Sequence, residues 1–156
     1  TSFFRHREHF ETLRDTILPA CLRRNGGFRQ LRIWSAGCSS GEEAYSIAIL
    51  LDRLKPQLQD WQITILATDV NPAALQRAAQ GSYREWSFRG TPTWVKQGYF
   101  KQGADGRFVL SPQIKESVQF TQLNLAQNIY PSFLSHTEAV DVIFCRNVLM
   151  YFWNCG

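Results

Sequence analysis

The stretch LRIWSAGCSSGEEAYSIA, residues 31–48, decides how this chain folds and what kind of ligand it can bind. An apolar strand runs into a glycine turn at 37–41, and an amphipathic helix follows that begins with Glu42 and Glu43. Such a turn commonly directs backbone N–H groups and the positive end of the helix dipole toward a phosphate. Two carboxylates at that position instead repel a pyrophosphate, accept hydrogen bonds from hydroxyls and attract cations. The stretch therefore predicts a nucleoside ligand without phosphates.

Length and composition indicate one folded domain. The chain has 156 residues, of which 44% are hydrophobic and 13% aromatic, and this is ample for a core. The formal charge of +4 suits an anionic partner. However, the arginines are spaced among acids, which favours a solvated face over a functional basic surface.

The spacing of the cysteines and the length of the apolar runs indicate in which compartment the protein works and whether it crosses a membrane. The four cysteines lie far apart, with neither metal-ligand nor disulfide-framework spacing, at Cys21, Cys38, Cys145 and Cys155. No secretory segment opens the chain, and no apolar run approaches the roughly 20 residues that span a bilayer. We therefore expect a cytoplasmic protein without membrane insertion.

The hydrophobic pattern predicts strands that alternate with helices. Helices are expected over 10–22, 42–55 and 72–81, and strands over 31–35, 62–68, 117–123 and 140–145. Between 82 and 116 we expect short helices and a hairpin that turns at 104–106. This order predicts an α/β, Rossmann-like fold with a parallel sheet at its core and helices on its faces.

In such a sheet the ligand lies outside the carboxyl ends of the strands. In chain order, these ends carry the segment 36–41, Asp69, Asn124 and the segment 145–147. Asp69 follows the glycine turn at about the distance at which dinucleotide-binding units place the acid that binds ribose hydroxyls. Its alternative role is a helix cap, but Asn71 and the proline after it already supply one.

The turn excludes a nicotinamide or flavin cofactor. Ser35 and Ser40 stand where the G-x-G-x-x-G fingerprint requires its first and third glycines. S-adenosylmethionine is an adenosine without phosphates, and its sulfonium and amino groups are attracted by carboxylates. We favour Glu43 as the residue that contacts it and expect Glu42 to be stabilised by the helix end, although the helix end alone can account for both acids.

Five segments carry a resemblance to a known family. They are TSFFR at 1–5, WSAGCSSGEEAYSIA at 34–48, ATDVN at 67–71, LNL at 123–125 and FCRNVLMYF at 144–152. In this order they resemble the chemotaxis receptor methyltransferases of the CheR type, which are protein-glutamate O-methyltransferases. The resemblance covers almost the whole chain. It implies a class I methyltransferase domain that uses S-adenosylmethionine and acts on methyl-accepting chemotaxis receptors.

The resemblance also implies site residues. The implied cofactor contacts are Thr1, Arg5, Glu43, Asp69, Asn124, Leu125, Cys145 and Arg146. Arg5 and Tyr151 are implied as catalytic residues beside the transferable methyl group. A glutamate titrates near pH 4.3 and is ionised at neutral pH, so the reaction needs positioning rather than a general base. From the residues alone, a surface ion pair for Arg5 and packing for Tyr151 are equally good interpretations.

Two other functions are weighed against this one. In a nucleic-acid methyltransferase Cys145 would be a thiol nucleophile, but no proline precedes it and no Pro-Pro-aromatic motif occurs. The second alternative is a signalling module that binds S-adenosylmethionine without transferring methyl groups. The histidines His6, His9 and His136 lack the carboxylate and histidine partners of a metal site, and we expect His6 and His9 to be solvated helix residues.

The ends of the chain are interpreted through the same resemblance. We expect a partial methyltransferase domain over 1–152, incomplete at the C-terminus, and an atypical or truncated end over 153–156. Family members carry a helical domain upstream and further strands downstream. Some also use a small β-subdomain to grip a receptor tail, and we expect that subdomain to lie outside this segment.

Overall fold

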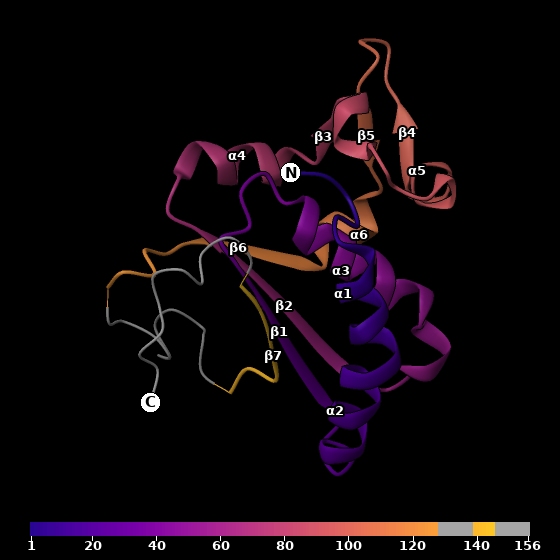
Figure 1. Ribbon diagram of the computed structural model, residues 1–156, viewed down its shortest axis with the longest axis vertical. Helices are drawn as coiled ribbons and strands as arrows, with labels where there is room; N and C mark the ends of the chain where they lie inside the picture. Colours follow the sequence, from indigo (N-terminus) through magenta and orange to yellow (C-terminus); the bar gives the residue numbers. More distant parts are fainter. Residues whose placement is uncertain (128–138, 146–156) are drawn as a thin grey trace.

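The computed structural model of the chain describes residues 1–127 and 139–145. Its main feature is a parallel sheet of four strands in the order β6-β2-β1-β7 (Figure 1). The strands are β1 (Gln30–Ala36), β2 (Gln62–Asp69), β6 (Val118–Gln122) and β7 (Val142–Cys145). The predicted α/β fold is confirmed, and each parallel strand lies within two residues of its predicted bounds.

The register brings the carboxyl ends of the strands together. Ala36 of β1 is paired with Thr68 of β2 on one side and with Cys145 of β7 on the other. Asp69, one step further along β2, is paired with Gln122 of β6. Because β2 and β7 flank β1 on opposite sides, the strand order reverses at β1. Such a reversal opens a crevice at the carboxyl ends, which is where open α/β sheets bind ligands.

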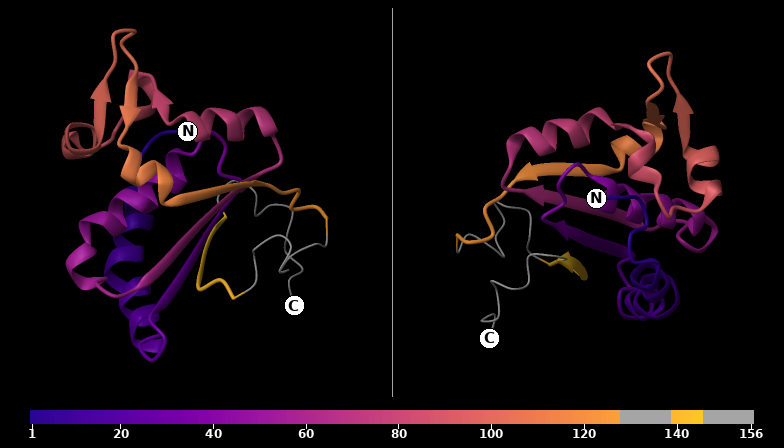
Figure 2. Two further views of the ribbon diagram at one scale, coloured as in Figure 1. Left: turned by 180° about the vertical axis from the view of Figure 1, so that it is seen from behind. Right: turned by 45° about the horizontal axis from the view of Figure 1, so that its top comes forward.

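Helices form a layer on one face of this sheet. Figures 1 and 2 show α1, α2 and α3 running along that face. The helical elements that join or cover the parallel strands are α1 (Arg7–Thr12), η1 (Leu13–Ile17), α2 (Leu18–Arg24), α3 (Glu42–Arg53), η2 (Lys55–Gln57), α4 (Pro72–Gln80) and α6 (Pro112–Glu116). No helix in the described parts of the chain combines the length and apolar character needed to cross a membrane.

The core divides along the alternation of β1. Leu31 and Ile33 belong to the large cluster that includes Phe10 of α1 and Ile47 of α3. Trp34 and Ala36, which alternate with them along β1, belong to a smaller cluster that also contains Leu66 of β2 and Leu123. Because successive side chains of a strand point to opposite faces, these two clusters mark the two sides of the sheet.

The first predicted helix contains an irregular turn. Helical structure runs from α1 into α2, but Leu13–Ile17 between them form one wider π-helical turn. Pro19, in the first turn of α2, has no N–H to donate to the carbonyl four residues earlier. The wider turn accommodates this missing bond, and the helix continues.

The chain forms a second sheet in the part of the sequence between α4 and α6. This sheet is antiparallel, and its strand order is β3-β5-β4. Its strands and associated helices are β3 (Ser82–Tyr83), η3 (Glu85–Phe88), α5 (Thr93–Tyr99), β4 (Phe100–Gln102) and β5 (Phe108–Leu110). The predicted hairpin is confirmed: the N–H of Gly103 donates to the carbonyl of Arg107 at 2.8 Å. The rest of this second sheet was not predicted. These strands are two or three residues long, too short for alternation to reveal them.

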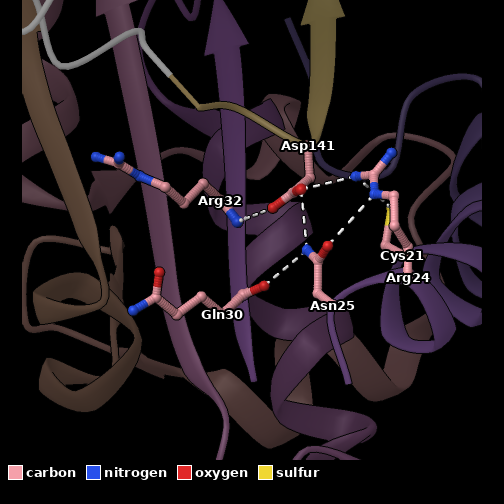
Figure 3. Close-up of polar contacts among 6 residues, drawn as sticks. All are labelled: Cys21, Arg24, Asn25, Gln30, Arg32 and Asp141. Carbon is pink, nitrogen blue, oxygen red and sulfur yellow. Dashed lines mark hydrogen bonds and ion pairs between the residues drawn. The ribbon is translucent and has the colours of Figure 1, made fainter. Parts of the chain in front are cut away.

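Asp141, just before β7, ties the end of α2 to the amino end of the sheet (Figure 3). Its Oδ1 accepts hydrogen bonds from Arg24 Nη2 at 2.7 Å and Asn25 Nδ2 at 2.9 Å. Its Oδ2 accepts from the backbone N–H of Arg32 at 2.8 Å. Burial alone would raise the pKa of Asp141, but these hydrogen bonds hold it below its usual value. The ionised carboxylate therefore fixes α2, β1 and β7 relative to one another.

Candidate functional site

The glycine turn between β1 and α3 is held by the end of β2. The N–H of Cys38 donates to the carbonyl of Thr68 at 2.9 Å, and the N–H of Ser39 donates to Oδ2 of Asp69 at 2.8 Å. The N–H of Gly41 closes the turn on the carbonyl of Cys38 at 2.9 Å. These three donors are engaged within the protein, so they do not form a phosphate cradle.

Position 41 requires glycine, both because of its backbone conformation and because a side chain would have no room there. Its φ of 91° lies in the region that favours glycine. A Cβ at this position would lie 2.9 Å from Cβ of Ala78 and 3.2 Å from Oη of Tyr83. The Tyr83 hydroxyl in turn donates to the carbonyl of Ser40 at 2.7 Å. The turn is therefore packed against α4 and β3 and offers a rigid edge to the site.

The two glutamates at the start of α3 occupy different environments. Glu42 is 3% exposed, and its carboxylate accepts hydrogen bonds from the hydroxyls of Ser40 at 2.6 Å and Ser87 at 3.2 Å. Glu43 accepts a hydrogen bond from the Ser35 hydroxyl at 2.7 Å and also lines a cavity. The buried acid thus links the turn to η3, whereas its neighbour faces a space that a ligand can enter.

This cavity brings together three of the implied cofactor contacts. Its volume is about 40 Å³, and it is lined by Thr1, Ser2, Arg5, His6, Gly37, Cys38 and Glu43. A space of that size accommodates one small polar group rather than a whole nucleoside. Thr1 is further placed by its hydroxyl, which lies 3.3 Å from the Ser40 hydroxyl. The N-terminal segment and the start of α3 thus form one site, although they are far apart in sequence.

The carboxylates give the site a negative character. The pKa of Cys38 is raised to about 12, first by burial and then by the carboxylates of Asp69 and Glu43. The pKa of Cys145 is also raised, first by burial and then by Glu43. Both thiols are therefore neutral at physiological pH. The same negative field stabilises a cationic ligand group.

Asp69 has a role that sequence reasoning missed. Its Oδ2 holds the glycine turn through Ser39, and its Oδ1 accepts a hydrogen bond from the N–H of Asn71 at 2.9 Å. The cap of α4 is Asn71, whose side-chain oxygen accepts from the N–H of Ala73 at 3.0 Å and of Ala74 at 3.4 Å. The prediction that Asn71 caps α4 is confirmed, and ribose binding by Asp69 stays a prediction.

The remaining predicted contacts lie at the ends of β6 and β7. Oδ1 of Asn124 accepts from the N–H of Ala126 at 2.9 Å and shapes the turn after β6. Leu125 and Cys145 are partly buried against the smaller core cluster, on the face of the sheet that carries Trp34. Arg146, Tyr151 and His136 lie outside the described residues.

His6 and His9 are both exposed, as predicted, but only His9 lies within α1. The helical position predicted for His6 is wrong. His6 precedes the helix with a φ of 58° and lines the cavity beside Arg5. The position of His6 next to Arg5 in the sequence is the signal that could have indicated its place in the cavity wall. Among the described residues, no group of three or more His, Cys, Asp or Glu side chains is placed to hold a metal ion.

The arrangement at the carboxyl ends identifies the class of domain. The N–H groups of the first βα turn are engaged within the protein, Glu43 puts negative charge where a phosphate-binding fold would avoid it, and Asp69 stands where such folds place the acid that binds ribose. This donor set fits a cofactor with hydroxyls and a positive charge but no phosphate. The domain is therefore of the Rossmann-like class that binds S-adenosylmethionine.

Comparison with known proteins gives the family. The chain belongs to the CheR methyltransferase SAM-binding domain family, whose model matches residues 1–154. It is 38% identical over 155 residues to a chemotaxis protein methyltransferase of Borreliella burgdorferi, covering 97% of this chain and 53% of that protein. It is 41% identical over 152 residues to chemotaxis protein methyltransferase 2 of Vibrio cholerae, covering 97% of this chain and 51% of that protein.

A third relative is a probable chemotaxis protein methyltransferase of Rhizobium etli. The identity is 39% over 155 residues, which cover 97% of this chain and 56% of that protein. The chain thus spans about half the length of the curated relatives that it matches. The family assigns S-adenosylmethionine as the cofactor of the domain.

Proposed function

We propose that the protein transfers methyl groups from S-adenosylmethionine to glutamate carboxylates of methyl-accepting chemotaxis receptors and so tunes chemotactic adaptation. The observation that carries this proposal is the shared cavity of Arg5 and Glu43. It joins a cation suited to a substrate carboxylate and a carboxylate suited to the cationic end of the cofactor. The names of the relatives, chemotaxis protein methyltransferases, support the same class of reaction.

The proposed roles divide the site into a cofactor side and a substrate side. Glu43 attracts the cationic part of the cofactor, and Asp69 accepts hydrogen bonds from its ribose hydroxyls. The other cofactor contacts are Thr1, Asn124, Leu125, Cys145 and Arg146. Arg5 lines the cavity beside Glu43, and we assign binding of the incoming carboxylate to Arg5 and Tyr151.

The chemistry needs little beyond positioning. When bound, the cofactor supplies a methyl group activated by its sulfonium. A substrate glutamate is already ionised near neutral pH, so no residue of the chain has to remove a proton. The exposed guanidinium of Arg5 can hold that carboxylate with two parallel hydrogen bonds. Alignment and exclusion of water then supply most of the acceleration, because opposite charges combine into neutral products.

The proposed setting follows from the proposed substrate. The partners are the cytoplasmic parts of the receptors, so the protein acts in the cytoplasm without inserting into the membrane. Neither a nucleic acid nor a metal has a part in the reaction. The region 1–152 contributes the cofactor-binding part of the enzyme, and 153–156 are not assigned a role.

The test is a transfer assay with the full-length protein, labelled cofactor and purified cytoplasmic fragments of receptors. We expect label on receptor glutamates that is released by base, as carboxyl methyl esters are. Receptor fragments with Gln at the methylated positions are the matched control and should stay unlabelled. Cofactor binding without such transfer would identify a signalling module instead of an enzyme.

A further inference from the structure

The segment 84–89 presents an exposed tryptophan on the protein surface. Trp86 is 73% exposed, more than any other large hydrophobic side chain among the described residues. The guanidinium carbon of Arg89 lies 4.4 Å from the centre of the Trp86 ring, which is a cation–π arrangement. Trp and Arg are the residue types most enriched where protein interfaces gain their affinity. We call these two residues the Trp86–Arg89 patch.

The patch is held rigidly. One guanidinium nitrogen of Arg89, Nη1, donates to the carbonyl of Trp86 at 2.8 Å and to the carbonyl of Thr1 at 2.9 Å. The guanidinium is therefore fixed in place while it stacks on the indole. A preorganised pair loses less conformational entropy on binding than two mobile side chains.

The patch also borders the cavity that contains Arg5 and Glu43. Thr1, which accepts the hydrogen bond from Arg89, lines that cavity. The next residues along the chain strengthen the link: the N–H of Phe3 donates to the carbonyl of Ser87 at 2.9 Å, and the Thr91 hydroxyl donates to the carbonyl of Phe3 at 2.9 Å. A partner that covers Trp86 would therefore lie beside the mouth of the cavity.

The charge around the patch is positive. Segment 84–89 contains Arg84, Glu85 and Arg89, and the carboxylate of Glu85 is paired with Lys96 at 2.6 Å. Arg5, also exposed, lies on the adjacent cavity wall. This combination complements a partner surface that is acidic and offers an apolar side chain for the indole to cover.

We propose that the Trp86–Arg89 patch docks the acidic protein surface that surrounds the glutamate to be methylated. Trp86 buries an apolar side chain of the partner, and the positive charge around it attracts the flanking carboxylates. The docked partner then presents its glutamate to Arg5. This inference rests on the proposed function for the identity of the partner, but its test measures binding separately from methyl transfer.

The experiment compares Trp86→Ala with Phe28→Ala in the full-length protein. Phe28 is the matched control: its side chain is 63% exposed, and it lies between α2 and β1, at the opposite end of the sheet. Affinity is measured by titration with a receptor cytoplasmic fragment and, separately, with S-adenosylmethionine. We expect Trp86→Ala to raise the Kd for the receptor fragment about tenfold. The Kd for the cofactor should change less than about twofold, and Phe28→Ala should leave both constants within about twofold.

Trp86→Phe provides a second variant, because a phenyl ring keeps most of the apolar surface. Its Kd for the receptor should lie within about threefold of that of the parent protein. An unchanged receptor affinity for Trp86→Ala overturns the docking proposal, whether or not methyl transfer occurs. A large fall in Tm together with weaker cofactor binding also overturns it, because Trp86 would then be structural.

The two proposals fail separately. If the parent protein binds the receptor in a Trp86-dependent way but transfers no methyl group, the docking surface stands and the proposed function is wrong. If it transfers methyl groups with equal KM in Trp86→Ala, the function stands and the docking proposal is wrong. A parent protein that neither binds nor methylates the receptor overturns both.

Discussion

At the amino end of the parallel sheet, one carboxylate, Asp141, collects hydrogen bonds from Arg24, Asn25 and the backbone of Arg32. At the carboxyl end, Glu43 and Arg5 line a cavity. Both ends gather charge from segments distant in sequence. The difference is access: the charges at the amino end are directed at one another, whereas those at the carboxyl end border a space that a ligand can enter.

The two ends also differ in the cavities that the described residues form there. A cavity of about 320 Å³ lies between α3, α6 and the first residues of β2 and β6, against about 40 Å³ for the cavity at Arg5. The larger one is lined by aliphatic side chains such as Leu51 and Ile63 together with polar and charged ones such as Asp52 and Glu116. It lies away from the strand-order reversal, where open sheets bind their ligands. The cavity at Arg5 lies at the carboxyl ends, and it brings the charged side chains of Arg5 and Glu43 together.

The largest expected effect comes from breaking the amino-end network with Asp141→Ala. The buried Asn25 amide would lose an acceptor, and so would the backbone N–H of Arg32. We expect the free energy of unfolding to fall by about 2 kcal/mol. The affinity for S-adenosylmethionine should stay within about twofold, because the network lies at the far end of the sheet. Denaturant titration and cofactor titration measure the two quantities.

The control for this variant is Asp15→Ala, which removes another aspartate that is paired with an arginine. Arg14 Nε donates to Asp15 at 2.7 Å, but both side chains are about half exposed, so the loss should be much smaller. The pH dependence gives a second check. Because the folded pKa of Asp141 is lowered, its contribution is present above its unfolded pKa, about 3.9, and is lost as the pH falls through the folded value. A stability gap between parent and Asp141→Ala that stayed constant between pH 7 and pH 3 would contradict this role.

The comparison also separates what sequence can predict from what it cannot. The parallel strands were predicted because alternation and apolar runs are local signals. The carboxyl-end site was predicted because the parallel topology gathers strand ends whatever their sequence separation. Asp141 and Arg24 carry no such signal, since their contact depends on how α2 packs against β7. The same holds for the burial of Glu42, which needs a hydroxyl from Ser87.

The second-largest expected effect comes from Glu43→Gln at the carboxyl end of the sheet, and it distinguishes the roles of Glu43 and Glu42. Glu43→Gln removes the negative charge that faces the cavity but keeps the shape of the side chain. We expect the Kd for S-adenosylmethionine to rise about tenfold, with a change in Tm of less than about 2 °C. Isothermal titration and a thermal melt measure both quantities on the same sample.

Glu42→Gln is the matched control, because it is the same substitution one residue earlier, in a buried position with two hydroxyl donors. Its main effect should be on stability, since an amide nitrogen next to a hydroxyl donor loses a hydrogen bond. The opposite pattern, with Glu42→Gln weakening cofactor binding more than Glu43→Gln, would show that the two acids have been assigned the wrong way round.

The smallest expected effect tests whether every group at the carboxyl end takes part in the chemistry. Cys145 ends β7 opposite Ala36, where a base methyltransferase could carry a nucleophile. Burial, and then the nearby Glu43, raises the pKa of Cys145, so the thiol stays protonated and is a poor nucleophile near neutral pH. Cys145→Ala should therefore change the rate of receptor methylation by less than about threefold, through looser packing and a weaker cofactor contact. Loss of all transfer in this variant, with cofactor binding intact, would mean that the thiol reacts. In that case the carboxyl end would perform covalent catalysis rather than the positioning that we infer for Arg5.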